Sequence, residues 1–247
     1  MSITFDRQKL LAFCRSTPGG APEDLTGVAA ALSQPSCASY QDLFNELSTQ
    51  DSETIYAAAW ALSQVVGTPE KVTLESLAID EDEPRVVFGD LTVDTDIYNG
   101  SALVVLGDLR CDSYTDADPN LALVVLGDAR MRWANVYGSA RFGGDWLVEE
   151  LLFAIDHSCS LDVAGTLRAK LLLLEDKTLR ASSEVVELRY DSRTDKEAEL
   201  DALKATLLPA LIATEDERED GEFAVRIEKL LQRVDERKPI YRKKGRR

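Results

Sequence analysis

Between residues 83 and 192 the chain repeats a short segment in which apolar residues lead into Gly-Asp and alternate with polar residues after it. The Gly-Asp pairs begin at Gly89, Gly107, Gly127 and Gly144, and Gly165 with Thr166 forms a related fifth turn. Successive glycines lie 18, 20, 17 and 21 residues apart. A β-rich repeat with a period of about 19 residues predicts stacked supersecondary units.

Every second residue of these segments is apolar or glycine when the segments are aligned on their glycines. The set is Val87, Gly89, Leu91 and Val93; Val105, Gly107, Leu109 and Cys111; Val125, Gly127, Ala129 and Met131; Phe142, Gly144, Trp146 and Val148; Val163, Gly165, Leu167 and Ala169. Because side chains alternate between the two sides of a strand, this set faces one interior. Hairpin signals are absent between the segments, so a flat meander is disfavoured. The pattern predicts a right-handed β-helix, or β-solenoid, of about five coils with a glycine bend in each.

The residues that should point outward are of two kinds. After each glycine, Asp90, Asp108, Asp128 and Asp145 form a column of like charges, with Arg110, Arg130 and Arg168 two residues further on. This column is either a functional acidic ladder or a structural one that the arginines offset. Before each glycine, three coils carry apolar residues on the outward side as well: Val86, Phe88, Val104, Leu106, Val124 and Leu126. Doubly apolar strands are typical of burial on both sides, so helices of this chain or a partner must cover them.

Helical patterns flank the repeats. Apolar spacing predicts helices near residues 5–13, 22–32, 40–47 and 55–66, then near 200–211 with a break at Pro209, and over 223–234. We therefore divide the chain into a helical N-terminal cap (1–69), a β-solenoid (70–192), a helical C-terminal segment (193–236) and a basic tail (237–247). The N-terminal helices are placed to cap the first coil. The C-terminal segment either caps the last coil or lies on an apolar outer face.

The net charge of −16 limits the kinds of partner that the protein can bind. Residues 70–191 hold 24 acidic and 11 basic residues, so the acidity lies on the repeats. Such acidity opposes nucleic-acid binding and favours a basic partner, although it also serves solubility. The basic tail is a disordered end, which can fold back on the acidic coils; nucleic-acid binding is the alternative. No apolar run is long enough for a membrane span and no signal peptide is recognisable, so we expect a cytoplasmic protein without membrane contact.

Residues suited to catalysis or metal binding are sparse. The cysteines Cys14, Cys37, Cys111 and Cys159 are scattered, which disfavours a zinc site or a disulfide framework. His157 is the only histidine, and no nucleophile is marked beside it. The Gly-Asp pairs match neither a phosphate-binding loop nor the GGxGxD calcium repeat. We therefore expect no enzyme, no cofactor and no metal.

The junctions between coils mix acids with aromatic residues, which often anchor protein interfaces. Such junctions stack on one edge of a solenoid and can form a binding surface, although the composition is also ordinary for turns. The predicted partner-binding residues are Asp94, Asp96, Tyr98, Asp112, Tyr114, Asp116, Asp118, Trp133, Tyr137, Asp156 and His157.

The recurrent Val-Val-Leu-Gly-Asp-Leu-Arg, together with residues 97–100 and 153–157, resembles a group of acidic bacterial β-helix proteins, often labelled polymer-forming and distantly similar to bactofilins. Many proteins of this group accompany polymorphic or type VI secretion toxins as immunity proteins. The resemblance covers residues 83–192. It implies an immunity protein that is a monomer or a small homo-oligomer and that occludes a toxin with a basic surface. A nuclease is one such toxin. The alternative is a bactofilin-like scaffold that polymerises through bare coil ends.

Overall fold

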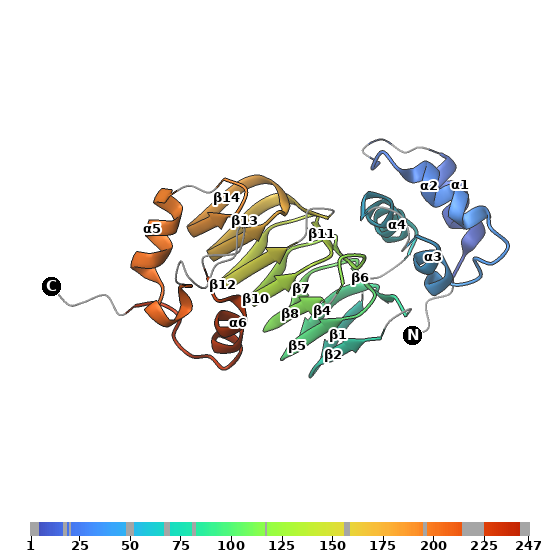
Figure 1. Ribbon diagram of the computed structural model, residues 1–247. Helices are drawn as coiled ribbons and strands as arrows, with labels where there is room; N and C mark the ends of the chain where they lie inside the picture. Colours follow the sequence, from blue (N-terminus) through green and yellow to red (C-terminus); the bar gives the residue numbers. More distant parts are fainter. Residues whose placement is uncertain are drawn as a thin grey trace.

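The protein is a parallel β-solenoid of about six turns with helices packed on two of its sides, as a computed structural model shows (Figure 1). The structure describes residues 5–16, 19, 21–47, 52–66, 70–80, 83–116, 118–155, 159–194, 197–213 and 225–242. The helices are α1 (Arg7–Arg15), α2 (Leu25–Ser33), α3 (Tyr40–Leu47), α4 (Ser52–Val65), α5 (Glu197–Thr206), the 3₁₀ turn η1 (Pro209–Leu211) and α6 (Ile227–Asp235). The strands are β1 (Glu70–Leu74), β2 (Leu77–Ile79), β3 (Arg85–Val87), β4 (Gly89–Val93), β5 (Asp96–Asn99), β6 (Ala102–Val105), β7 (Leu109–Arg110), β8 (Ser113–Asp116), β9 (Ala122–Val125), β10 (Ala129–Val136), β11 (Ser139–Phe142), β12 (Trp146–Ile155), β13 (Ser160–Glu175) and β14 (Thr178–Asp191).

Parallel strand pairing divides the solenoid into three faces. The first face stacks β1, β4 and β7 with the beginnings of β10 and β12. The second face stacks β2, β5 and β8 with the ends of β10 and β12. The third face stacks β3, β6, β9 and β11. The long strands β13 and β14 run through all three faces.

The predicted interior is confirmed. All fifteen side chains of the glycine-aligned set are buried and belong to one hydrophobic cluster inside the coils. Leu109, for example, lies in register between Leu91 and Ala129 of the neighbouring coils. Burial of a Val, Leu, Ile or Phe side chain stabilises a fold by about 1.5–3 kcal/mol, so this column is a principal source of stability.

The solenoid is longer than the glycine pattern predicts because its first and last coils lack a Gly-Asp pair. In the first coil, Glu70 and Lys71 occupy the positions that pair with Gly89 and Asp90. In the last coil, Ser183 pairs with Thr166. The first coil has no preceding coil, and the last coil follows Thr166, which has no carboxylate, so neither meets the preceding carboxylate that crowds the repeat glycines.

The N-terminal helices cover the third face and do not cap the first coil. Val104 and Val124 are fully buried in the hydrophobic cluster that also contains the cores of α1–α4, and the Phe88 ring packs at a tilt against Tyr40 of α3 with ring centroids 4.7 Å apart. The outward apolar residues predicted from the sequence are therefore covered by this chain's own helices. The helices lie beside the coils because the apolar side chains of three coils offer more surface to bury than one coil end does, and burial of apolar surface is favourable.

The C-terminal segment covers the second face, which is the second of the two placements expected for it. Leu203, Leu207 and Leu230 pack there. They contact an apolar outward set made of Trp133, Leu151, Phe153, Leu171, Leu173, Leu188 and Tyr190. The segment continues into the tail, where Ile240 is buried and its carbonyl accepts a hydrogen bond from the Leu208 N–H at 2.9 Å. Residues 237–242 are thus part of the fold and not a disordered end, while 243–247 lie outside the described residues.

The last coil places charged residues where earlier coils have the interior core. Glu184, Arg189 and Asp191 pair in register with Leu167, Leu172 and Leu174. Arg189 forms ion pairs with Glu184 and with Asp191, the latter at 3.5 Å. This arrangement, which we call the charged lid, ends the apolar column. Inward-pointing charges at an edge discourage further strand addition.

Candidate functional site

The aspartate column is part of the coil architecture. Each carboxylate accepts a hydrogen bond from the main-chain N–H at the same position in the next coil. The Asp128 N–H donates to Asp108 at 2.9 Å, and the Asp145 N–H donates to Asp128 at 2.8 Å. The series ends at Thr166, which donates to Asp145 at 2.7 Å and carries no carboxylate. The structural interpretation of the ladder is therefore supported, although main-chain donors stabilise it and the arginines do not pair with it among the described residues.

The glycine before each aspartate makes room for this contact. A Cβ atom at Gly127 would lie 2.2 Å from Oδ1 of Asp108 and 2.9 Å from the Gly107 carbonyl group. Such approaches are too close for any other residue, so the glycine and the carboxylate of the preceding coil form one interlocked unit. The repeated Gly-Asp pair is thus explained by coil stacking.

The predicted partner-binding residues do not form one edge. Asp94 and Asp112 lie where the first face turns into the second, whereas Asp118 and Tyr137 lie where the second face turns into the third. Strand β5 runs from the first of these corners to the second, so its length separates them. Asp156 and His157 lie outside the described residues.

Three of the predicted residues are exposed together beside the first coils. Asp94 and Asp96 are exposed, and Tyr98 on β5 keeps 51% of its surface. Asp96 also accepts a hydrogen bond from Ser113 at 2.5 Å, which fixes its side chain. We call Asp94, Asp96 and Tyr98 the acidic patch. It occupies the outer side of the second face in the coils that the C-terminal segment leaves uncovered.

Three other predicted residues are buried and cannot contact a partner from these positions. Trp133 keeps 7% of its surface under the C-terminal segment, and Tyr114 and Asp116 keep none. The Tyr114 hydroxyl accepts a hydrogen bond from Asn99 at 2.9 Å and lies 3.4 Å from Asp116. The prediction was wrong for Tyr114 and Asp116 because β8 turns these alternate residues inward. It was wrong for Trp133 because the C-terminal segment covers this outward residue of β10.

Asp116 and Lys177 both bind the main chain of Tyr137 and Gly138 at one corner of the solenoid, the first through N–H groups and the second through carbonyl groups. Asp116 accepts hydrogen bonds from the N–H groups of Tyr137 and Gly138, at 2.5 and 3.2 Å. The fully buried Lys177 ammonium donates to the Tyr137 and Gly138 carbonyls and to that of Ile155. Burial raises the pKa of Asp116 to about 6, and the hydrogen bonds and the lysine limit that rise. No sequence motif marks Lys177, because its partners are main-chain groups 22 to 40 residues earlier.

Asp112 belongs to a charge cluster that fastens the C-terminal segment. Arg132 donates to Asp112 at 2.9 Å, to Glu150 at 3.2 Å and to the Val234 carbonyl of α6 at 2.6 Å. Arg237 from the tail reaches Asp112 at 3.1 Å. The hydrogen bond from Arg132 is the main reason why the pKa of Asp112 lies below its ordinary value. The tail therefore folds back on an acidic residue of the coils, as the charge distribution suggested.

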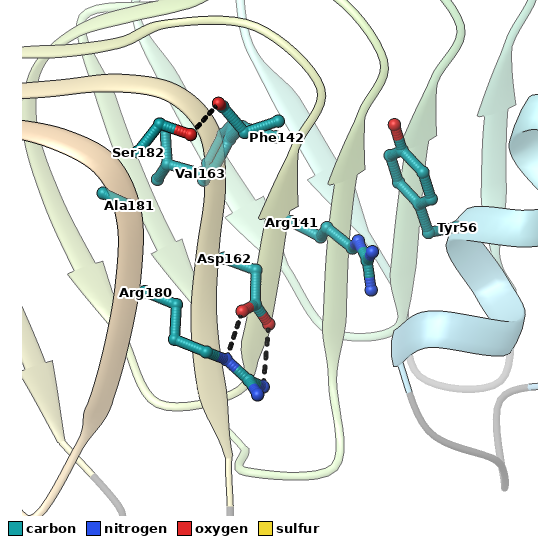
Figure 2. A pocket seen from close by; sticks show the side chains of 9 residues that line it. Tyr56, Arg141, Phe142, Asp162, Val163, Arg180, Ala181 and Ser182 are labelled. Carbon is teal, nitrogen blue, oxygen red and sulfur yellow. Dashed lines mark hydrogen bonds and ion pairs between the residues drawn. The ribbon is translucent and has the colours of Figure 1, made fainter. Parts of the chain in front are cut away.

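A second uncovered surface was not predicted from the sequence. It is a hollow of about 310 Å³ between α4 and the last coils of the third face, lined by Tyr56, Arg141, Asp162, Arg180 and Ser182 together with Phe142, Val163, Ala164 and Ala181 (Figure 2). We call it the arginine hollow. The sequence does contain a sign of this surface, because the outward residues of the third face change from valine to charged types. In one column of paired positions, Val86, Val104 and Val124 are followed by Arg141, Asp162 and Arg180.

The described residues contain no group of three or more His, Cys, Asp and Glu side chains that could hold a metal ion. The four cysteines are free thiols, and burial raises the pKa of Cys14 to about 11. Within the described part of the chain, no helix has the length and apolarity needed to cross a membrane. Comparison with protein-family models, curated proteins and solved structures finds no match to this chain.

Proposed function

We propose that the protein is a binding protein that occludes a basic partner through the acidic patch, and that this partner is a toxin which the protein neutralises. The observation that carries the proposal is the exposed Tyr98, which follows the exposed carboxylates of Asp94 and Asp96 along the same side of the chain at β5. A few residues carry most of the binding energy in protein interfaces, and Tyr is frequent among them, while surrounding charges set the approach and the choice of partner.

The surroundings of the patch support the same role. The acidic charge is concentrated on the solenoid, so its field attracts a basic surface and speeds association. Asp96 is held by Ser113 and β5 is paired on both sides, so little conformational entropy is lost on binding. A toxin that acts on nucleic acid would present such a basic surface.

The test uses the product of the adjacent gene as the candidate toxin. The full chain is co-expressed with it, growth is scored, and the dissociation constant of the purified pair is measured. We expect Tyr98→Ala combined with Asp94→Lys and Asp96→Lys to weaken binding at least 100-fold and to abolish protection. The matched control, Glu197→Lys with Asp201→Lys on the exposed side of α5, should stay within about three-fold. Continued killing without a complex, or equal loss in both variants, would contradict the proposal.

A second candidate is a scaffold that polymerises end to end, and one observation favours it. Both flanking segments pack on faces, and among the described residues no strand pairs with the outer edges of β1 and β14. The charged lid opposes stacking at β14. Light scattering separates the two candidates, because the scaffold requires filaments or heterogeneous assemblies where the binding protein gives a single small species.

A further inference from the structure

The arginine hollow exists because the outward residues shrink along one column of the third face. The column begins with Phe88, Leu106 and Leu126, which pack under the N-terminal helices. It continues with Gly143, Ala164 and Ser182. Helix α4 contacts β9 and β11, and no described helix covers the same face at β13 and β14. Small residues beside the edge of a helix leave the recess seen in Figure 2.

Two polar groups in this recess make no hydrogen bond to the described part of the protein. The Arg141 guanidinium lies 4.4 Å from the centroid of the Tyr56 ring, and its ion pair with the exposed Glu53 is 3.5 Å long. Neither Arg141 nor the Tyr56 hydroxyl makes a hydrogen bond within the described part of the chain. The hydroxyl lies 3.1 Å from the point that a Cβ at Gly143 would occupy, so the absence of a side chain there admits it to the recess.

A second guanidinium stands at the rim. Arg180 donates to Asp162 at 2.6 Å and keeps 69% of its side chain exposed. Asp162 also accepts a hydrogen bond from Ser160 at 2.7 Å, which fixes the carboxylate. Arg180 is therefore held near the recess with donors left over, because a guanidinium has five N–H groups.

We propose that the arginine hollow binds the carboxylate or phosphate group of an acidic ligand, held by Arg141 and Arg180. The planar fork of a guanidinium matches the two oxygens of such a group, and Arg141, which lies over the Tyr56 ring, has N–H groups beyond the one that faces Glu53. The protein's overall negative charge is no barrier at physiological salt, since charges farther than about 8 Å are largely screened. The site lies on the third face, so it is separate from the acidic patch.

The test is a titration of the full chain with inorganic phosphate and, separately, with citrate, followed by the NMR resonances of the arginine Nε–H groups in 0.15 M salt. We expect a saturable shift of the Arg141 resonance with at least one of the two probes. Arg141→Gln should weaken binding at least ten-fold. Asp162→Asn should strengthen it about three-fold or more, because it releases Arg180 from its ion pair.

Arg168→Gln serves as the control, since Arg168 is an exposed arginine on the first face and should leave binding unchanged. A shift with phosphate alone or citrate alone supports the site and identifies the class of its ligand. The proposal is overturned if neither probe gives a saturable shift. It is also overturned if Arg141→Gln and Arg168→Gln bind equally well, or if Asp162→Asn weakens binding as much as Arg141→Gln does.

Discussion

Replacing Leu109 by aspartate tests the inside and outside of the coils directly. Leu109 keeps 1% of its surface and lies between Leu91 and Ala129, which offer no hydrogen-bond donor from their side chains. The substitution loses about 1.5–3 kcal/mol of apolar burial. It also buries a carboxyl group, which costs several kcal/mol more even if the group takes up a proton. We expect a total loss of about 4–6 kcal/mol, against a typical reserve of about 5–15 kcal/mol.

The matched control is Arg110→Asp, one residue further along the same strand. Arg110 is exposed and points outward, so its replacement changes charge without touching the core. The expected loss is below about 1 kcal/mol. Thermal and urea unfolding of both variants, followed by circular dichroism, measures the difference. Equal melting temperatures would refute the assignment of the interior column, and with it the identification of the acidic patch as an outer surface.

Three further predictions concern the ladder, the buried carboxyl group and the C-terminal segment. Gly127→Ala should lower the free energy of unfolding by about 2–4 kcal/mol, and by less when Asp108 is also replaced by alanine. A double-mutant cycle should give a coupling energy of at least about 1 kcal/mol between the two positions. Additive effects would contradict the interlocked packing of Gly127 against Asp108. Because the folded-state pKa of Asp116 is raised to about 6, the folded protein binds this proton more tightly than the unfolded chain. The free energy of unfolding of the wild type minus that of Asp116→Asn should therefore fall by about 3 kcal/mol as the pH rises from about 3, below the unfolded-state pKa, to about 7, above the folded-state pKa. A flat difference would contradict the burial of an ionisable Asp116. Arg132→Met removes the hydrogen bond to α6, so amide exchange of α6 should accelerate about ten-fold or more, whereas Arg130→Met, which breaks an exposed pair, should not change it.

The parts of the fold that were predictable from the sequence are those set by alternation around the glycines. The interior column and the outward apolar residues of the third face both follow from a period of two, and both are confirmed. The second face was missed because the alignment ended four residues after each glycine. Its signal was the unbroken apolar runs at 151–155 and 171–174, where inward and outward residues are both apolar and alternation gives no contrast.

Contacts between distant coils were beyond the reach of such patterns. A column of aspartates suggests repulsion when only side chains are considered, yet each carboxylate here accepts a main-chain N–H of the next coil. The burial of Lys177 depends on three carbonyl groups that the sequence does not distinguish from any others. The acidic patch was predicted only in part, because Tyr98 and Tyr114 occupy similar junctions and differ in the side of the strand to which they point.

The two uncovered surfaces have a common physical origin. On the third face the outward residues are apolar in the early coils and become polar from β11 onward, and the N-terminal helices cover only the early coils. On the second face the order is reversed, and the C-terminal segment covers only the later coils. Each flanking segment thus lies where it buries apolar surface, which leaves the acidic patch at one end of the solenoid and the arginine hollow at the other. Since the coils between them are rigidly stacked and the surfaces share no residue, we expect a variant that disables one to leave binding at the other unchanged.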